Sequence, residues 1–83
     1  MGRLKVARRQ TYDVQPANGR SGWDVIKEGN ATPVSHHRTK DPAIDSAVAK
    51  AKQAELGEVR IKGRDGTIQD ERTYGKDPYP PKG

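Results

Sequence analysis

Basic side chains in the first forty residues are the strongest chemical signal in this sequence. Only three acidic residues accompany them, whereas residues 41–83 balance eight basic against eight acidic side chains, so the net charge of +5 arises in the first half. Because clustered Lys and Arg attract phosphate, these basic residues are candidates for nucleic-acid binding. The alternative is a solvated surface that keeps a small protein soluble. The candidates are Arg3, Lys5, Arg8, Arg9, Arg20, Lys27, Arg38 and Lys40.

The other reactive side chains form no catalytic or metal-binding pattern. His36 and His37 are adjacent, so on a strand they point to opposite faces and cannot share one metal ion. Ser35, His36 and Asp41 have the residue types of a hydrolase triad, but such close sequence neighbours rarely converge, and no Gly-x-Ser-x-Gly motif is present. We therefore expect no enzyme activity, no metal, no cofactor and no small-molecule substrate.

Length and composition allow one small domain with a thin core. The chain has 83 residues and a mass of 9.1 kDa. Leu, Ile, Val and Phe make up about 14% of it, below the ~20% at which disorder becomes a concern. Without cysteine, stability must come from packing or from oligomerisation, so a homodimer is one expectation. No apolar run approaches ~18 residues, which predicts a cytoplasmic protein without a membrane partner.

Alternating apolar and polar residues predict three short strands, at residues 12–16, 22–27 and 33–38. Clusters of Gly, Asn, Ser and Pro separate them, so they are expected to form an antiparallel meander. Pro33 lacks an amide donor and suits an edge position or the beginning of a strand. Residues 1–10 are expected to precede the sheet as a basic flexible arm.

A helix and a hairpin are predicted to follow the meander. Asp41 is the expected cap of a helix at 42–56, and Gly57 its terminator. Apolar and polar residues alternate again over residues 58–62. The dipeptide Asp65-Gly66, a few residues further on, is typical of a two-residue hairpin loop. That loop would place Val59, Ile61 and Ile68 on one face. The resulting fold is a single α+β domain at residues 11–73, in which the hairpin joins the meander in one antiparallel sheet layer.

The predicted core combines one face of the strands with the apolar stripe of the helix. Trp23 is expected to be buried rather than to stack on a base, because this chain has no Phe and needs its large ring. The Pro-rich residues 74–83 are expected to be an extended tail that docks on its own domain or on a partner. The full core prediction is Tyr12, Val14, Trp23, Val25, Val34, Ile44, Ala47, Val48, Ala51, Leu56, Val59, Ile61 and Ile68.

Four short motifs follow one another in a distinctive order along the chain. They are Gly22-Trp23-x-Val25, Ser35-His36 with Thr39-Lys40, Arg64-Asp65-Gly66 and the segment 73–81. Their order resembles the bacterial family called domain of unknown function 2188, over residues 12–81. The resemblance implies a small bacterial α+β domain with three strands, a helix and a further hairpin, and no established activity. It transfers no catalytic or binding residue to this chain.

Taken together, the sequence predicts a non-enzymatic binding module with weak affinity for DNA or RNA through its basic first half. The alternative is a module for protein-protein interaction or for self-assembly as a homodimer, with no nucleic-acid role. The two hypotheses differ in their dependence on salt, which weakens phosphate contacts.

Overall fold

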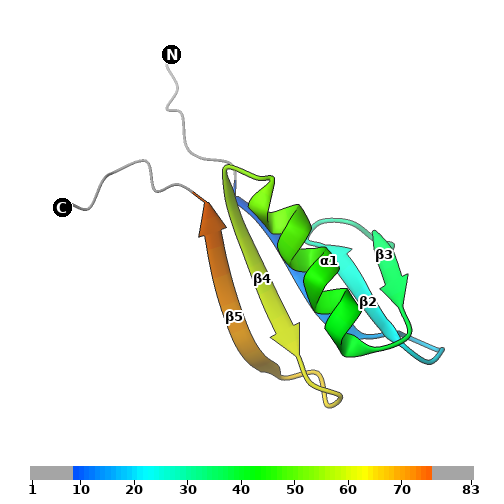
Figure 1. Cartoon of the computed structure of the whole chain (residues 1–83). Coiled ribbons are helices and arrows are strands. Elements are labelled where there is room, and N and C mark those ends of the chain that lie inside the picture. The colour runs from blue at the N-terminus through cyan, green and yellow to red at the C-terminus, as the bar shows by residue number, and fades with distance from the viewer. Residues whose placement is uncertain (1–8, 76–83) are drawn as a thin grey trace.

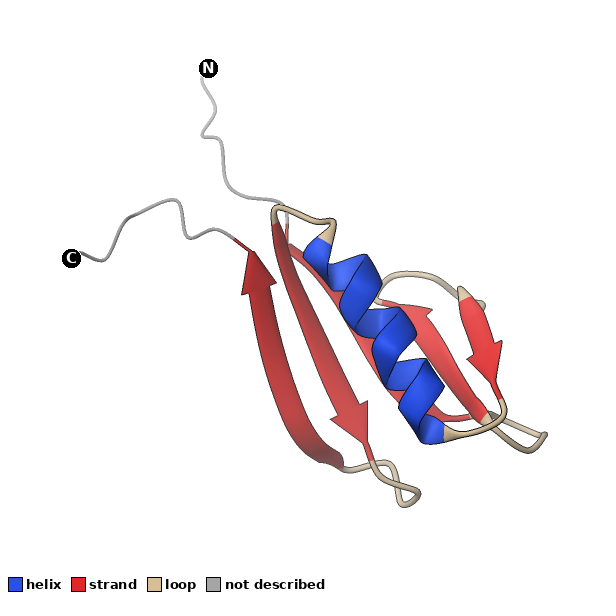
Figure 2. Cartoon of the chain, in the orientation of Figure 1, coloured by secondary structure: helices blue, strands red, loops and turns tan. Residues whose placement is uncertain are grey.

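The computed structural model describes residues 9–75. In this part of the chain, one helix covers one face of a five-stranded sheet (Figure 1). Figure 2 shows the two layers, with the helix running roughly along the strands. The elements are β1 (Arg9–Pro16), β2 (Trp23–Lys27), β3 (Ser35–His37), α1 (Lys40–Lys52), β4 (Leu56–Lys62) and β5 (Ile68–Gly75).

The strand order is β3-β2-β1-β4-β5, and the sheet is mixed. The β1-β2-β3 meander and the β4-β5 hairpin are antiparallel, as expected, but β1 and β4 pair in parallel. The expectation of a wholly antiparallel sheet is therefore wrong at this junction. A parallel pair needs a crossover connection, and α1 is part of that crossover, which places it over the sheet.

The helix begins and ends earlier than predicted. Thr39 is the N-cap and its side chain makes no capping hydrogen bond, so Asp41 lies in the first turn rather than at the cap. The last helical residue is Lys52, and Gly57 is a buried residue of β4. A Cβ atom at Gly57 would overlap the Ala51 carbonyl oxygen. Gly57 is thus needed where the helix end approaches the sheet, and not as a terminator.

The core lies between α1 and the sheet. Among the described residues it contains nine buried hydrophobic side chains, eight of which were predicted. Ala43 was missed because the predicted stripe began at Ile44, although Ala43 lies one turn before Ala47 on the same face. Ile44 and Val48 pack against the core only partly, and Leu56 is half-buried. Val34 and Ile68 are exposed, so their assignment to the core is wrong. The buried hydrophobic residues of this core are Tyr12, Val14, Trp23, Val25, Ala43, Ala47, Ala51, Val59 and Ile61.

The position of Ile68 follows from the hairpin loop, which is longer than predicted. The Gly66 amide donates to the Gly63 carbonyl at 3.0 Å, and the Gly63 amide donates to the Thr67 carbonyl at 2.9 Å. Gly66 has φ +87, so three residues turn the chain instead of two. Ile61 still pairs with Asp70, because a bulge next to this pair restores the predicted register.

Strand lengths also differ from the prediction at both ends of the sheet. β1 includes Arg9 and Gln10, which were assigned to the arm. β5 continues to Gly75, through the start of the segment predicted to be the tail. β3 is confined to Ser35–His37, so Pro33 precedes the strand. Residues 76–83, the rest of the predicted tail, lie outside the described residues.

The helix that the structure describes is too short and too polar to cross a membrane.

Candidate nucleic-acid interface

Trp23 lies at the start of β2 and has two cations over its ring. Lys40 Nζ, at the start of α1, is 5.0 Å from the ring centroid, and Arg64 Cζ, in the β4-β5 loop, is 5.5 Å from it. Both distances are within the range of cation-π attraction. Because β1 is antiparallel to β2 and parallel to β4, the end of β4 lies at the same end of the sheet as the start of β2. Arg64, which follows β4, is therefore close to Trp23.

Arg38 is a third cation, two residues before Lys40 in the chain. It follows His37, which is opposite Trp23 in the β2-β3 ladder, and its side chain is exposed. We call Arg38, Lys40 and Arg64 the cationic end. No ion pair to Asp or Glu involves any of the three within residues 9–75, and Lys40 Nζ donates only to Gln69 Oε1, at 2.8 Å. Among the described residues, none of the three charges is therefore held in an ion pair with a carboxylate.

The start of α1 adds to the positive potential at the cationic end. The first backbone amides of a helix have no partner within the helix and carry a partial positive charge. The Thr39 side chain makes no capping hydrogen bond to them. Asp41 in the first turn offsets part of this potential. The three cationic side chains each add a full positive charge at this end of the sheet.

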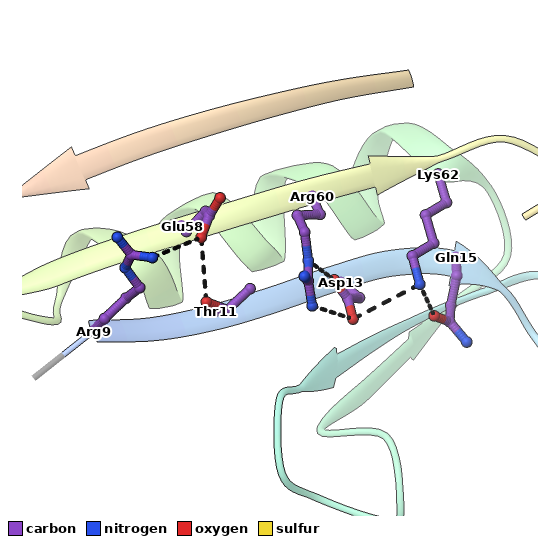
Figure 3. Close-up of polar contacts among 7 residues, drawn as sticks. All are labelled: Arg9, Thr11, Asp13, Gln15, Glu58, Arg60 and Lys62. Carbon is purple, nitrogen blue, oxygen red and sulfur yellow. Dashed lines mark hydrogen bonds and ion pairs between the residues drawn. The ribbon is translucent and has the colours of Figure 1, made fainter. Parts of the chain in front are cut away.

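The sheet face opposite α1, which we call the open face, has a different electrostatic arrangement (Figure 3). Arg60 on β4 donates to both carboxylate oxygens of Asp13 on β1, from Nε at 2.7 Å and from Nη2 at 3.1 Å. This hydrogen bonding raises the pKa of Arg60, against the opposing effect of burial. Lys62 Nζ lies 3.9 Å from Asp13 and donates to Gln15 Oε1 at 3.3 Å.

Further along the same two strands, Glu58 pairs with both a cation and a hydroxyl group. Arg9 Nη1 is 3.9 Å from Glu58 Oε1, and the buried Thr11 donates to the same oxygen at 3.4 Å. The open face therefore pairs each of its basic side chains on β1 and β4 with an acidic one. A phosphate group would have to displace these carboxylates, so the open face is a poor phosphate-binding surface.

The two histidines point to opposite faces, as predicted, and each has its own partner. His36 Nδ1 lies 2.6 Å from Oδ1 of the buried Asp24, which Arg20 Nη2 also approaches at 3.4 Å. His37 Nε2 lies 2.9 Å from Ser35 Oγ. The hydroxyl and the carboxylate thus contact different imidazoles, so Ser35, His36 and Asp24 do not form a triad. No three His, Asp or Glu side chains of residues 9–75 gather as a metal site.

An open groove of about 360 Å³ lies next to the cationic end. It separates the β1-β2 loop from the β4-β5 loop, and Lys62, Arg64 and Asp65 contribute to its wall together with Gln15 and Asn18. Asp65 is exposed, and hydrogen bonds from the Thr67 amide and hydroxyl lower the pKa of its carboxyl group. The groove therefore has a polar lining with both signs of charge.

The structure brings together only two of the eight predicted binding residues, Arg38 and Lys40. Arg20 forms an ion pair with Asp24, and Arg9 forms one with Glu58. Lys27 is at the opposite end of β2 from Trp23. Arg3, Lys5 and Arg8 lie outside the described residues.

Sequence reasoning missed Arg64, which completes the cationic end. Its position beside the Asp65-Gly66 turn indicated only that it would be exposed at a loop. Its approach to Trp23 depends on the parallel pairing of β1 with β4, for which the local pattern gave no signal.

Comparison with known proteins gives one match. The sequence model of a family described as an uncharacterized protein conserved in bacteria (DUF2188) matches residues 12–74. No curated protein matches the chain, and no solved structure does.

Proposed function

The chain belongs to the bacterial family DUF2188, whose description names no activity, and we propose from its own surface that it is a non-enzymatic module that binds nucleic acid weakly. In this proposal the cationic end contacts the phosphate backbone. The paired charges on the open face take no part in this contact. The contact positions the protein without reading bases, because phosphate contacts carry no sequence information.

The observation that carries the proposal is the arrangement of Lys40 and Arg64 over the buried ring of Trp23. A cation held over an aromatic ring keeps its charge and its donor groups, but has fewer conformations to lose when it binds phosphate. Arg38 extends the positive surface from a neighbouring segment. Three cations from two segments of the chain, residues 38–40 and the β4-β5 loop, favour a ligand with several phosphates over a single small anion.

Salt dependence is the quantitative expectation. Three phosphate contacts on duplex DNA predict a slope of log K against log salt of about −2.7. Affinity should therefore fall by roughly fortyfold between about 50 and 200 mM salt. Such a dependence would distinguish phosphate contacts from an apolar interface, which salt does not weaken in this way.

The experiment compares two triple variants by fluorescence anisotropy with a labelled DNA duplex. R38Q/K40Q/R64Q removes the cationic end. We expect about tenfold or greater loss of affinity, and a salt slope shallower by about 1 for each phosphate that the variant no longer neutralises. K27Q/K50Q/K52Q removes the same charge from β2 and α1, away from the cationic end, and is the matched control. Thermal unfolding of both variants establishes that each remains folded.

Two results contradict the proposal. One is equal loss of affinity in both triple variants, which would mean that net charge alone attracts the DNA. The other is the absence of binding by the unmodified protein at low salt. A third variant, R3Q/K5Q/R8Q, measures the contribution of the basic segment before β1, which we expect to steepen the salt dependence of the full chain.

A further inference from the structure

β5 is a long edge strand that is largely exposed in the part of the chain that the structure describes. Its eight residues end the sheet on one side, and all of them except Tyr74 are exposed. The opposite edge, β3, has only three residues. The outer backbone of β5 therefore offers hydrogen-bonding groups that no strand of residues 9–75 pairs with, and such an edge is a template for another strand.

The charges of β5 are arranged to favour pairing with itself. Asp70 and Arg72 lie on the same face, opposite Ile61 and Val59 of β4, and Arg72 Nε lies 3.1 Å from Asp70 Oδ2. An antiparallel pair of β5 strands with its twofold axis at Glu71 places Asp70 of each copy opposite Arg72 of the other. This register forms two additional opposite-charge pairs across the contact, each of which stabilises paired strands.

Other registers are less favourable. A twofold axis at Arg72 places two guanidinium groups opposite each other, and an axis at Asp70 places two carboxylates together. With the axis at Thr73, no residue of the other copy's β5 lies opposite Asp70, because β5 ends at Gly75. The axis at Glu71 also places two Glu71 side chains opposite each other, but this is one like-charge pair against the two opposite-charge pairs that the same register forms.

We propose that β5 pairs with β5 of a second copy of this chain, antiparallel and centred on Glu71, to form a continuous ten-stranded sheet. A twofold axis perpendicular to the sheet keeps both helices on the same side. It also places the two cationic ends at opposite ends of the assembly. This dimer does not depend on nucleic acid, so its failure and the failure of the proposed function are separate results.

Single-cysteine cross-linking tests the register, because the chain has no cysteine of its own. Residues on the twofold axis are directly opposite their own copies, within reach of a disulfide. Under mild oxidation we expect E71C to form a covalent dimer at least tenfold faster than T73C, and an equal mixture of D70C and R72C to form the heterodimer. Rapid self-linking of T73C or R72C instead would overturn the Glu71 register.

Charge reversal tests the same pairing without a covalent bond. D70R places four cations at the contact and should weaken the dimer at least tenfold in sedimentation equilibrium, whereas D70R/R72D exchanges the charges and should restore it. K50D on α1 is the control and should leave dimerisation unchanged. A protein that stays monomeric at every concentration by light scattering, with no cross-linking of E71C, would overturn the proposal.

Discussion

Two arginines four residues apart, Arg60 and Arg64, differ in what their charge can do. Arg60 donates twice to Asp13, so its guanidinium is committed to the sheet. Arg64 lies over Trp23 and has no acidic partner within residues 9–75. The sequence shows only that both are basic. Pairing across the β1-β4 ladder determines which of them remains available for phosphate.

The pair of Asp13 and Arg60 should stabilise the fold and contribute little to binding. In urea unfolding, a double-mutant cycle of D13N, R60Q and the double variant should give a coupling energy of about 1 kcal/mol, as for a well-aligned pair that is mostly covered. R60Q should change DNA affinity less than twofold, whereas R64Q, with the same change in charge, should weaken it by more than twofold. A larger loss for R60Q would place binding on the open face.

Asp65 should make stability depend on pH in the acidic range. Its carboxylate accepts two hydrogen bonds from Thr67, which lower its pKa below the usual 3.8. A carboxyl group with a lowered pKa stabilises the fold fully above its unfolded value and loses that effect as pH falls through its folded value.

The measurement is unfolding of the unmodified protein and of D65N between about pH 7 and pH 2. We expect the unmodified protein to be more stable near neutral pH and the difference to shrink below about pH 4. A difference that is constant over the whole range would show that the Asp65 charge is not involved. T67V, which removes the hydroxyl donor but keeps the amide, should reduce the pH-dependent part only partly.

At the scale of elements, local patterns located the helix and strands but not their junctions. The alternation around Val14, Val25 and Ile61 identified three strands, because these side chains must reach one core. Loop length was wrong at Asp65-Gly66, since a bulge can compensate for one extra loop residue without any change in the apolar pattern. The helix end was wrong because Gly57 is required for close approach to Ala51, which a pattern cannot distinguish from a terminator.

Gly22 and Gly29 provide a matched test of how tightly β2 and β3 are packed. Both have positive φ, +100 and +97, so alanine is strained at either position by about 1 kcal/mol. A Cβ at Gly22 would also lie 2.5 Å from the His37 carbonyl oxygen and 2.8 Å from the His36 ring, whereas nothing lies within 4 Å of one at Gly29.

We therefore expect G22A to lower the free energy of unfolding by about 3 kcal/mol, and G29A by about 1 kcal/mol. Chemical denaturation measures both values. Equal losses in the two variants would mean that β3 moves away from Gly22 at no cost. In that case the His36-Asp24 contact would not hold the short edge strand in place.

At the scale of the whole molecule, the basic first half of the sequence is not one surface. Arg9 and Lys27 lie toward one end of the sheet, and Arg20, Arg38 and Lys40 toward the other. The fold class could be predicted because apolar periodicity changes from two to 3.6 and back along the chain. The binding surface could be predicted only in part, since the pairing of β1 with β4 joins residues almost fifty positions apart.

The central claim is that nucleic acid contacts the cationic end. A titration of the isotope-labelled protein with a short DNA duplex, followed by two-dimensional ¹⁵N-¹H NMR, tests it most directly. We predict that the largest shifts occur at the amides of residues 38–40 and 63–67 and at the Trp23 indole N–H, while Thr11, Asp13 and Arg60 stay nearly unchanged. Largest shifts on the open face, or a spectrum that DNA does not change at low salt, would contradict this account.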